Sequence, residues 1–411
     1  MNAKVTLKFP LKISLISIIS VFLFADLITL SYFESPIYTL IQYISLLIMG
    51  IFAILQIRYI KFQDVIFLLS SLLMGLCIVI ASYFNKVNPA ALRGSIYYAI
   101  LLFVMCIFLV EAGNKKALRQ VLLGGKVYLM VVLLLNDFLM IALPNTFNNI
   151  SGRDIGTTLL GNKFNVSYSH LMLMFILVFL EERLKKRNRK IIVYAMLLSI
   201  LCLYVECSTA MLACWVFVIL YFLPEGLKEF ISKPSVFIIV FFLSAFLLLS
   251  FSGILTWGPI KYLIVNILHR DATLTGRMQV YPYIYKLVSS QSWWGYGYGT
   301  DIVMKTSKWY ANAQNALWDF VICYGVITTA FLIIYMMFSV NRYSKCTTEK
   351  FRNSSWLIFV MVYVYIFMGI GEITYSKQFF FYIALLWSTS SIYKKQGKVR
   401  KRKVRKRKVR K

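Results

Sequence analysis

Long apolar segments recur along almost the whole chain and are separated by shorter polar stretches. A helix needs roughly 20 mostly apolar residues to cross the hydrocarbon core of a bilayer, and twelve segments approach that length. They are Leu11–Tyr32, Pro36–Ile57, Val65–Phe84, Gly94–Val110, Lys126–Leu143, Phe164–Leu180, Ile191–Cys207, Thr209–Leu223, Ser235–Leu255, Ala316–Val340, Ser355–Ile373 and Ser376–Tyr393. The pattern therefore predicts an all-α integral membrane protein of about twelve transmembrane helices. The seventh and eighth segments are the least clearly separated.

One polar stretch, residues 256–315 between the ninth and tenth predicted spans, is far longer than the others. A loop of this length beside a helical bundle is usually functional. Its apolar residues predict short helices that fold back onto the membrane surface. Its aromatic side chains, which include Trp294 and Tyr296, have two interpretations: an interfacial belt, or platforms on which sugar rings stack.

The composition supports the membrane assignment. Hydrophobic residues make up 60% of the chain and charged residues 15%, whereas a soluble domain is about a quarter charged. A soluble enzyme, a disordered chain and a disulfide scaffold are therefore excluded. The seven cysteines lie mostly inside apolar segments and show no spacing typical of a metal site. The first apolar segment lacks a signal-peptide cleavage pattern, so we expect an uncleaved span.

The net charge of +29 reflects topology more than nucleic-acid binding. Thirteen Lys and Arg lie in a tail at 394–411, and 34 of all 45 lie on the same predicted side as the N-terminus. Cytoplasmic loops carry such an excess, so both termini are expected in the cytoplasm. The division is then a membrane domain at 1–393 and a basic cytoplasmic tail, which we expect to contact anionic membrane lipids. No nucleic-acid partner is expected.

The long loop carries positive charge on the side where positive residues are otherwise scarce. Arg270 and Arg277 lie in it, and guanidinium groups bind phosphate through paired hydrogen bonds. An anionic ligand would explain these arginines, although Arg270 could instead pair with its neighbour Asp271. Arg153 and Lys163, which flank the preceding outside loop, could join the same site.

Other titratable residues lie within or at the ends of predicted spans, where such groups are candidates for function. They are Asp26, Asp137, Glu206, Asp319 and Glu372, and the two histidines, His170 and His269. Either histidine could be a general base or only a structural donor. Asp319 follows Asn315 by about one helical turn. The sequence contains no zinc-protease motif, no Walker loop and no DxD motif, so we expect no metal or nucleotide cofactor.

Four short motifs occur in a distinctive order: Gly161–Asn165, Leu274–Arg277, Trp293–Gly297 and Asn312–Ala316, the last opening a span that contains Gly325. In this order, and with one large outside loop late in a chain of about twelve spans, they resemble the O-antigen ligase and polysaccharide polymerase superfamily. That family has an asparagine motif, a TGR segment, a GxG turn and a His-Asn motif entering a glycine-containing helix.

The resemblance implies transfer of a glycan from an undecaprenyl diphosphate carrier at the outer face of the bacterial cytoplasmic membrane, without metal or nucleotide. It implies that Arg277 binds the donor diphosphate. This chain has Gln314–Asn315 where the family has His-Asn, and glutamine cannot act as a base. Gln314 could orient the acceptor while Asp319 or His170 takes the proton. The chain also lacks the family's Ser-Arg pair after the seventh span, so Arg153 or Arg270 could supply a second charge.

Together these features predict a polymerase of capsular or O-antigen polysaccharide, a glycosyltransferase that moves a growing glycan onto a new lipid-linked repeat unit. The alternatives are a glycan ligase and a lipid-linked oligosaccharide flippase, although the chain shows no internal repeat of the transporter kind. Partners would be the lipid-linked oligosaccharide, membrane lipids and other polysaccharide assembly proteins. The expected catalytic residues are Arg277, Gln314, Asn315 and Asp319, and the expected substrate-binding residues are Arg270, Arg153, Asn162, Lys163, Trp294 and Tyr296.

Overall fold

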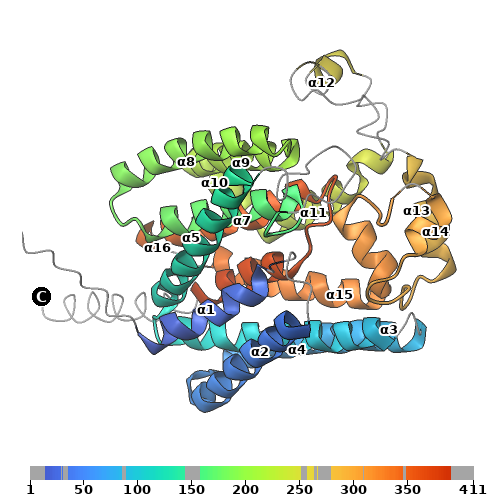
Figure 1. The fold of residues 1–411 in the computed structure, drawn as a ribbon, viewed down its shortest axis with the longest axis horizontal. Helices are drawn as coiled ribbons and strands as arrows, with labels where there is room; N and C mark the ends of the chain where they lie inside the picture. The colour runs from blue at the N-terminus through green and yellow to red at the C-terminus, as the bar shows by residue number, and fades with distance from the viewer. Residues whose placement is uncertain are drawn as a thin grey trace, which may run out of the picture.

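The computed structural model of the chain is helical throughout the part it describes (Figure 1). That part comprises residues 14–28, 30, 36–85, 89–143, 158–250, 257–262, 266, 279–308, 310–345 and 349–389. Its helices are α1 (Leu15–Leu27), α2 (Pro36–Gln56), α3 (Phe62–Asn85), α4 (Pro89–Asn114), α5 (Leu118–Ala142), α7 (Lys163–Leu180), α8 (Leu184–Tyr204), α9 (Ser208–Phe222), α10 (Glu225–Ile231), α11 (Pro234–Ser250), α12 (Gly258–Tyr262), α13 (Tyr281–Ser290), α14 (Ile302–Ser307), α15 (Ala316–Ser344), α16 (Glu349–Met368) and a last helix over 377–389. Within the described residues the only β-type contact is an isolated bridge between Thr158 and Gly161.

Several helices meet the length and hydropathy of a membrane span. Six do so individually: α2 with the 3-10 turn that follows it, α3, α4, α5, α7 and α15. The pair α9 and α10, bent by 115°, makes a seventh candidate. The described apolar parts of α1, α11 and α16 are shorter. The chain is therefore a multi-pass, all-α membrane protein with six to seven candidate spans.

The uncertain boundary between the seventh and eighth predicted spans is a true helix break. α8 ends at Tyr204 and α9 begins at Ser208, so the chain reverses between them. Glu206 adopts a left-handed conformation there, with φ of 54°, which stops α8 from continuing. The two helices then pack against each other. Two separate helices in this region, as the sequence predicted, are confirmed.

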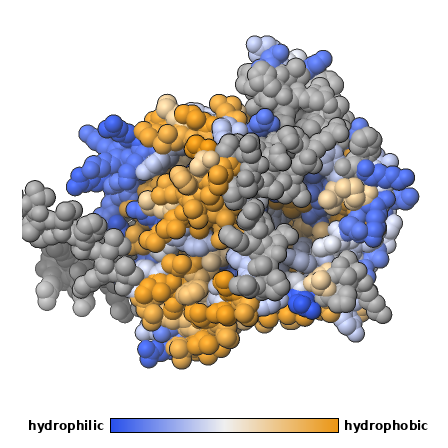
Figure 2. Space-filling model, viewed as in Figure 1, coloured by the Kyte–Doolittle hydropathy of each residue, from blue (hydrophilic) through white to orange (hydrophobic). Residues whose placement is uncertain are grey.

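The bundle has two distinct polar ends with an apolar band between them (Figure 2). At one end the connections between helices carry basic residues: Lys61 donates to Asn114, and Arg119 pairs with Glu182. We call this the basic end. The opposite end, which carries α13 and α14 (Figure 1), is the loop end. An apolar band between two polar ends is the surface expected of a protein that spans a lipid bilayer.

The centre of the bundle is filled by the last two helices of the described chain. Residues 355–366 of α16 and residues 379–389 are almost entirely buried, and both run through the middle of the molecule, in red (Figure 1). A helix that is apolar on all sides packs inside a large bundle. The Phe67 ring from α3 stacks on Tyr335 and on Trp387, with centroids 4.7 and 4.6 Å away, so outer helices are joined to this centre.

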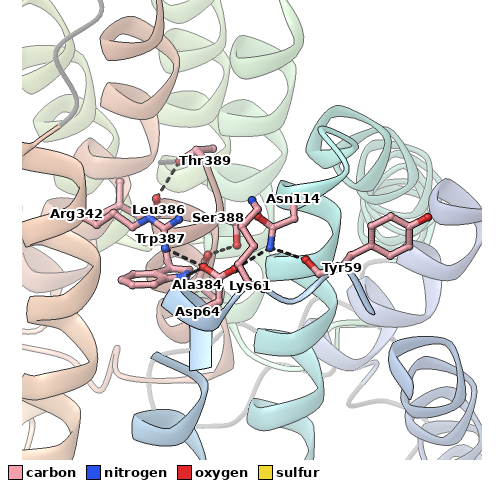
Figure 3. A network of polar contacts seen from close by, with 10 residues as sticks. All are labelled: Tyr59, Lys61, Asp64, Asn114, Arg342, Ala384, Leu386, Trp387, Ser388 and Thr389. Carbon is pink, nitrogen blue, oxygen red and sulfur yellow. Dashed lines mark hydrogen bonds and ion pairs between the residues drawn. The ribbon is translucent and has the colours of Figure 1, made fainter. Parts of the chain in front are cut away.

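A buried carboxylate holds the basic end together (Figure 3). Asp64 is completely buried and accepts hydrogen bonds from Arg342 Nη1 at 2.9 Å, Trp387 Nε1 at 3.1 Å and Asn114 Nδ2 at 2.7 Å. The backbone N–H of Lys61 adds a contact at 3.3 Å. The Arg342 guanidinium lies 4.0 Å from the centre of the Trp387 ring. One carboxylate thus joins α3, α4, α15 and the last helix.

Candidate functional site at the loop end

The described part of the long loop has its own small apolar core. Val280, Tyr281 and Ile284 pack with Val303 and with Ile322 of α15. The expected short helices are present as α13 and α14, and this core fixes them to the start of α15. The loop is therefore an ordered layer at the loop end, at least over residues 279–308.

α15 is interrupted near the loop end by Gly325, which has φ of 77° and ψ of 175°. The turn at residues 292–297 docks into this break and exchanges backbone hydrogen bonds with it. Tyr296 N donates to Ile322 O at 2.8 Å, Gly297 N donates to Cys323 O at 2.7 Å, and Val326 N donates to Ser292 O at 2.8 Å. Backbone groups that the break would leave unpaired are thereby satisfied, as the membrane environment demands.

Two glycines make this docking possible. A Cβ on Gly295, which has φ of 65°, would lie 2.5 Å from Ile322 O and 2.6 Å from Gly325 N. A Cβ on Gly325 would overlap the Trp293 carbonyl group. Only glycine tolerates both the positive φ and the close backbone approach. The glycine-rich turn at residues 292–297 is therefore fixed against α15.

The same segment is also attached to α3. Asn85 Nδ2 donates to Gly295 O at 2.8 Å, and Ser82 Oγ accepts from Tyr298 N at 2.9 Å. The Trp294 ring lies against Phe84, with centroids 6.0 Å apart. Trp294 is partly buried against α3, whereas its neighbour Trp293 is 67% exposed.

Tyr296 is held by both its side-chain hydroxyl and its backbone amide. Its hydroxyl donates to Leu287 O at 3.3 Å in α13, and its amide joins the break in α15. The turn that carries Trp294 and Tyr296 is thus brought against α15, the helix that begins directly after Gln314 and Asn315 and contains Asp319. These five expected site residues share one region of the loop end.

Asn315 forms the start of α15. Its Oδ1 accepts from Trp318 N at 3.2 Å, which caps the helix, and its Nδ2 donates to Ile370 O at 3.2 Å. Weaker contacts of 3.4 Å reach the carbonyl groups of Ser244 and Ala245 in α11. The side chain is 1% exposed. Its amide thus connects the start of α15, the turn that contains Ile370 and α11.

Gln314 and Asp319 hold the loop that precedes α15. Gln314 has φ of 51°, and its Nε2 donates to Asn312 Oδ1 at 2.6 Å. Asp319 Oδ1 accepts from the backbone N–H of Ala313 at 3.1 Å. A carboxylate in the first turn of a helix is also stabilised by the helix dipole. Both side chains are engaged with their own loop.

The start of α7 forms a second part of the loop end. Asn162 caps α7, with Oδ1 accepting from Asn165 N at 3.0 Å. Lys163 follows, and it lies close enough to Cys207 to act on it electrostatically, as does Glu372. Glu372 Oε1 accepts from Thr209 Oγ1 at 3.3 Å. Glu372 belongs to the same turn, residues 369–375, that receives the Asn315 amide, so the two parts are connected.

Helix starts gather at this end. α7, α9, α15 and the last helix all begin here. Helix N-termini carry partial positive charge and attract anions. Lys163, the first residue of α7, adds a positive charge, whereas Lys377, the first residue of the last helix, donates to the backbone carbonyl of Asp26. Lys305 is instead paired with Asp301 at 2.8 Å, which holds the pKa of the Asp301 carboxyl below its usual range.

The three arginines of the expected site, Arg153, Arg270 and Arg277, lie outside the described residues. Their predicted roles stay predictions. The described residues contain no group of His, Cys, Asp and Glu arranged to hold a metal ion. No protein-family model matches the chain, and no curated protein sequence matches it.

Two polar clusters contain residues that the sequence analysis named as separate candidates, without their partners. His170 of α7 pairs with Asp137 of α5. Asp26 of α1, completely buried, accepts from Tyr97 OH at 2.6 Å, and its backbone carbonyl accepts from Lys377 Nζ at 2.9 Å. The sequence showed that these ionisable residues lie within apolar segments, but it did not show which residues they would contact.

Proposed function

We propose that this protein is a membrane polymerase of surface polysaccharide. It would transfer a glycan from an undecaprenyl diphosphate carrier to a new lipid-linked repeat unit on the outer face of the bacterial cytoplasmic membrane. In that reaction a hydroxyl oxygen of the acceptor sugar bonds to C1 of the donor sugar. The bond between C1 and the diphosphate breaks, the diphosphate leaves with the electron pair, and the acceptor hydroxyl loses its proton to a base.

One observation carries the proposal. The turn at residues 292–297 docks into the break of α15 at Gly325, close to Gln314, Asn315 and Asp319. Two of the features that carried the resemblance, the Trp293–Gly297 turn and Gly325 of the span that follows Asn312–Ala316, are thus in contact, although they are separated in the sequence. Helix N-termini and Lys163 make the surroundings favourable for an anionic group such as a diphosphate.

The proposal includes twelve crossings with both termini in the cytoplasm. Its support is that each of the twelve apolar segments contains a helix, and that the basic connections meet at the end opposite α13 and α14. The loop end would then face outward, where the lipid-linked units are assembled. The diphosphate would lie at headgroup level, against the helix starts.

The test is the size distribution of surface and lipid-linked glycan in a strain that lacks the gene. The strain is complemented with wild type, with Arg277→Ala or with Lys286→Ala. Lys286 is an exposed lysine on α13 in the same loop, so its substitution removes one positive charge away from the expected diphosphate site. The amount of each variant in the membrane is measured in parallel.

We expect single lipid-linked repeat units to accumulate in the deletion strain, and long chains to return with wild type and K286A but not with R277A. Full-length chains that stay on the lipid carrier would contradict the polymerase and favour the ligase. Repeat units retained on the cytoplasmic face would contradict both enzymes and favour the flippase. Equal restoration by R277A and K286A would remove Arg277 from the site.

A further inference from the structure

A histidine and an aspartate form a hydrogen-bonded pair between α5 and α7. His170 Nε2 lies 3.0 Å from Asp137 Oδ2, and His170 Nδ1 lies 2.9 Å from the carbonyl oxygen of Val166. Both ring nitrogens therefore face acceptors. The imidazole is fixed in orientation and has no nitrogen left to take a proton from a substrate.

The carboxylate is the more accessible member of the pair. The Asp137 side chain is 32% exposed and the His170 side chain 17%. Asp137 Oδ1 also accepts from Asn136 Nδ2 at 3.2 Å. Asn136 is itself completely buried, and its Oδ1 accepts from Leu160 N at 3.3 Å. The carboxylate is thus oriented by two neighbours and still has an open side.

The pair lies toward the loop end. Asp137 is five residues from the end of α5, which is about 8 Å along the helix. His170 follows Lys163 by seven residues, so the two lie on nearly the same face of α7 about 10 Å apart. If these helices span the bilayer, residues one to two turns from their ends lie near the boundary between headgroups and hydrocarbon core, which is the level we expect for the diphosphate of a lipid-linked substrate.

Two residues that the sequence suggested for the acceptor side of the reaction, Gln314 and Asp319, are engaged in the loop before α15. Gln314 is an amide and cannot accept a proton at neutral pH. Asp319 holds the backbone N–H of Ala313. His170 has acceptors on both nitrogens. Asp137, which the sequence offered only as an ionisable group within a span, is a carboxylate whose side chain is 32% exposed and is oriented by both His170 and Asn136.

We propose that Asp137 takes the proton from the acceptor hydroxyl, and that His170 is a positioning residue that holds the carboxylate. This rests on the proposed polymerase function. As the acceptor oxygen bonds to C1 of the donor sugar, its proton passes to Asp137, and the C1–diphosphate bond breaks with the electron pair leaving on the diphosphate. The carboxylic acid then returns its proton to water.

The experiment measures the initial rate of chain elongation by purified protein in phospholipid vesicles. The substrate is the lipid-linked repeat units extracted from the deletion strain. Asp137→Asn keeps the shape and can still accept from His170, but it cannot take a proton. His170→Gln keeps an amide donor toward Asp137. Asp301→Asn is the control, because it removes an exposed carboxylate of the long loop. Asp137→Ala is assayed with and without added formate.

We expect a fall of about 100-fold or more for D137N, the usual effect of losing a general base, and a rate for D301N equal to wild type. H170Q should lose less, because its amide replaces the ring as donor. Formate should raise the rate of D137A by about tenfold, since it supplies the missing carboxylate. A merely structural role would not respond to formate.

A D137N rate within about threefold of wild type would overturn the assignment, as would a D137A rate that formate does not change. In either case active wild-type protein leaves the polymerase function standing. Wild-type protein that elongates nothing would instead remove the proposed function itself, so the two failures are distinguishable.

Discussion

Gly325→Ala tests the joint between the turn at residues 292–297 and α15. The φ of 77° and ψ of 175° at Gly325 lie in a region that is essentially restricted to glycine, at a cost of about 1–3 kcal/mol for other residues. The added Cβ would also overlap the Trp293 carbonyl and lie 2.6 Å from Trp294 N. The turn must therefore move, and three backbone hydrogen bonds of 2.7–2.8 Å between turn and break are lost at about 1 kcal/mol each.

The sum for Gly325→Ala is about 4–6 kcal/mol of lost stability. Gly299→Ala is the matched control, because Gly299 has a similar φ of 68° but nothing within 4 Å of an added Cβ. It should lose only about 1–2 kcal/mol, the cost of the left-handed backbone. The assay is unfolding in mixtures of SDS and mild detergent, followed by the reaction of buried thiols such as Cys106 and Cys214 with a fluorescent reagent. Equal stabilities of the two variants would refute the docking.

Three further substitutions give graded expectations in the same assay. Asp64→Ala should cost about 3–5 kcal/mol, because it removes the buried carboxylate that accepts from Arg342, Trp387 and Asn114, whereas Asp301→Ala breaks an exposed pair and should leave stability close to wild type. Asn315→Ala removes the cap of α15 and the bond to Ile370, so a loss of about 2 kcal/mol is expected; a neutral result would contradict the bracing role. Gly124→Leu places a side chain where α1 packs on α5, since even a Cβ would overlap Ser20; it should unfold the pair, while Gly50→Leu, with open space, should be tolerated.

The positions of the helices could be predicted from the sequence because hydropathy is a local property. Each apolar segment contains a helix, and even the boundary near Cys207 lies where α8 gives way to α9. The basic connections at Lys61 and Arg119 meet at one end of the bundle, and that this end faces the cytoplasm stays a prediction. Helix length in the described residues supports six to seven spans, because α8 begins with charged residues and α1 is short.

The site was predictable only in part because its decisive contacts are tertiary. The sequence indicated Trp293–Gly297 and Gly325 as separate features, and nothing local revealed that the turn fills the break in α15. Asn315 was expected to act in catalysis, and the structure shows its amide occupied by a helix cap and by Ile370. Asp137 and His170 lie 33 residues apart in sequence, so their pairing required the packing of α5 on α7.

The central claim is that the protein joins lipid-linked repeat units, and reconstitution tests it most directly. Purified wild-type protein is placed in phospholipid vesicles with lipid-linked repeat units from the deletion strain, and both glycan length and released carrier are followed. The account predicts a ladder of longer lipid-linked chains, with one carrier diphosphate released for each new glycosidic bond. Repeat units that stay single, with no carrier released by protein that is folded in the vesicles, would contradict it.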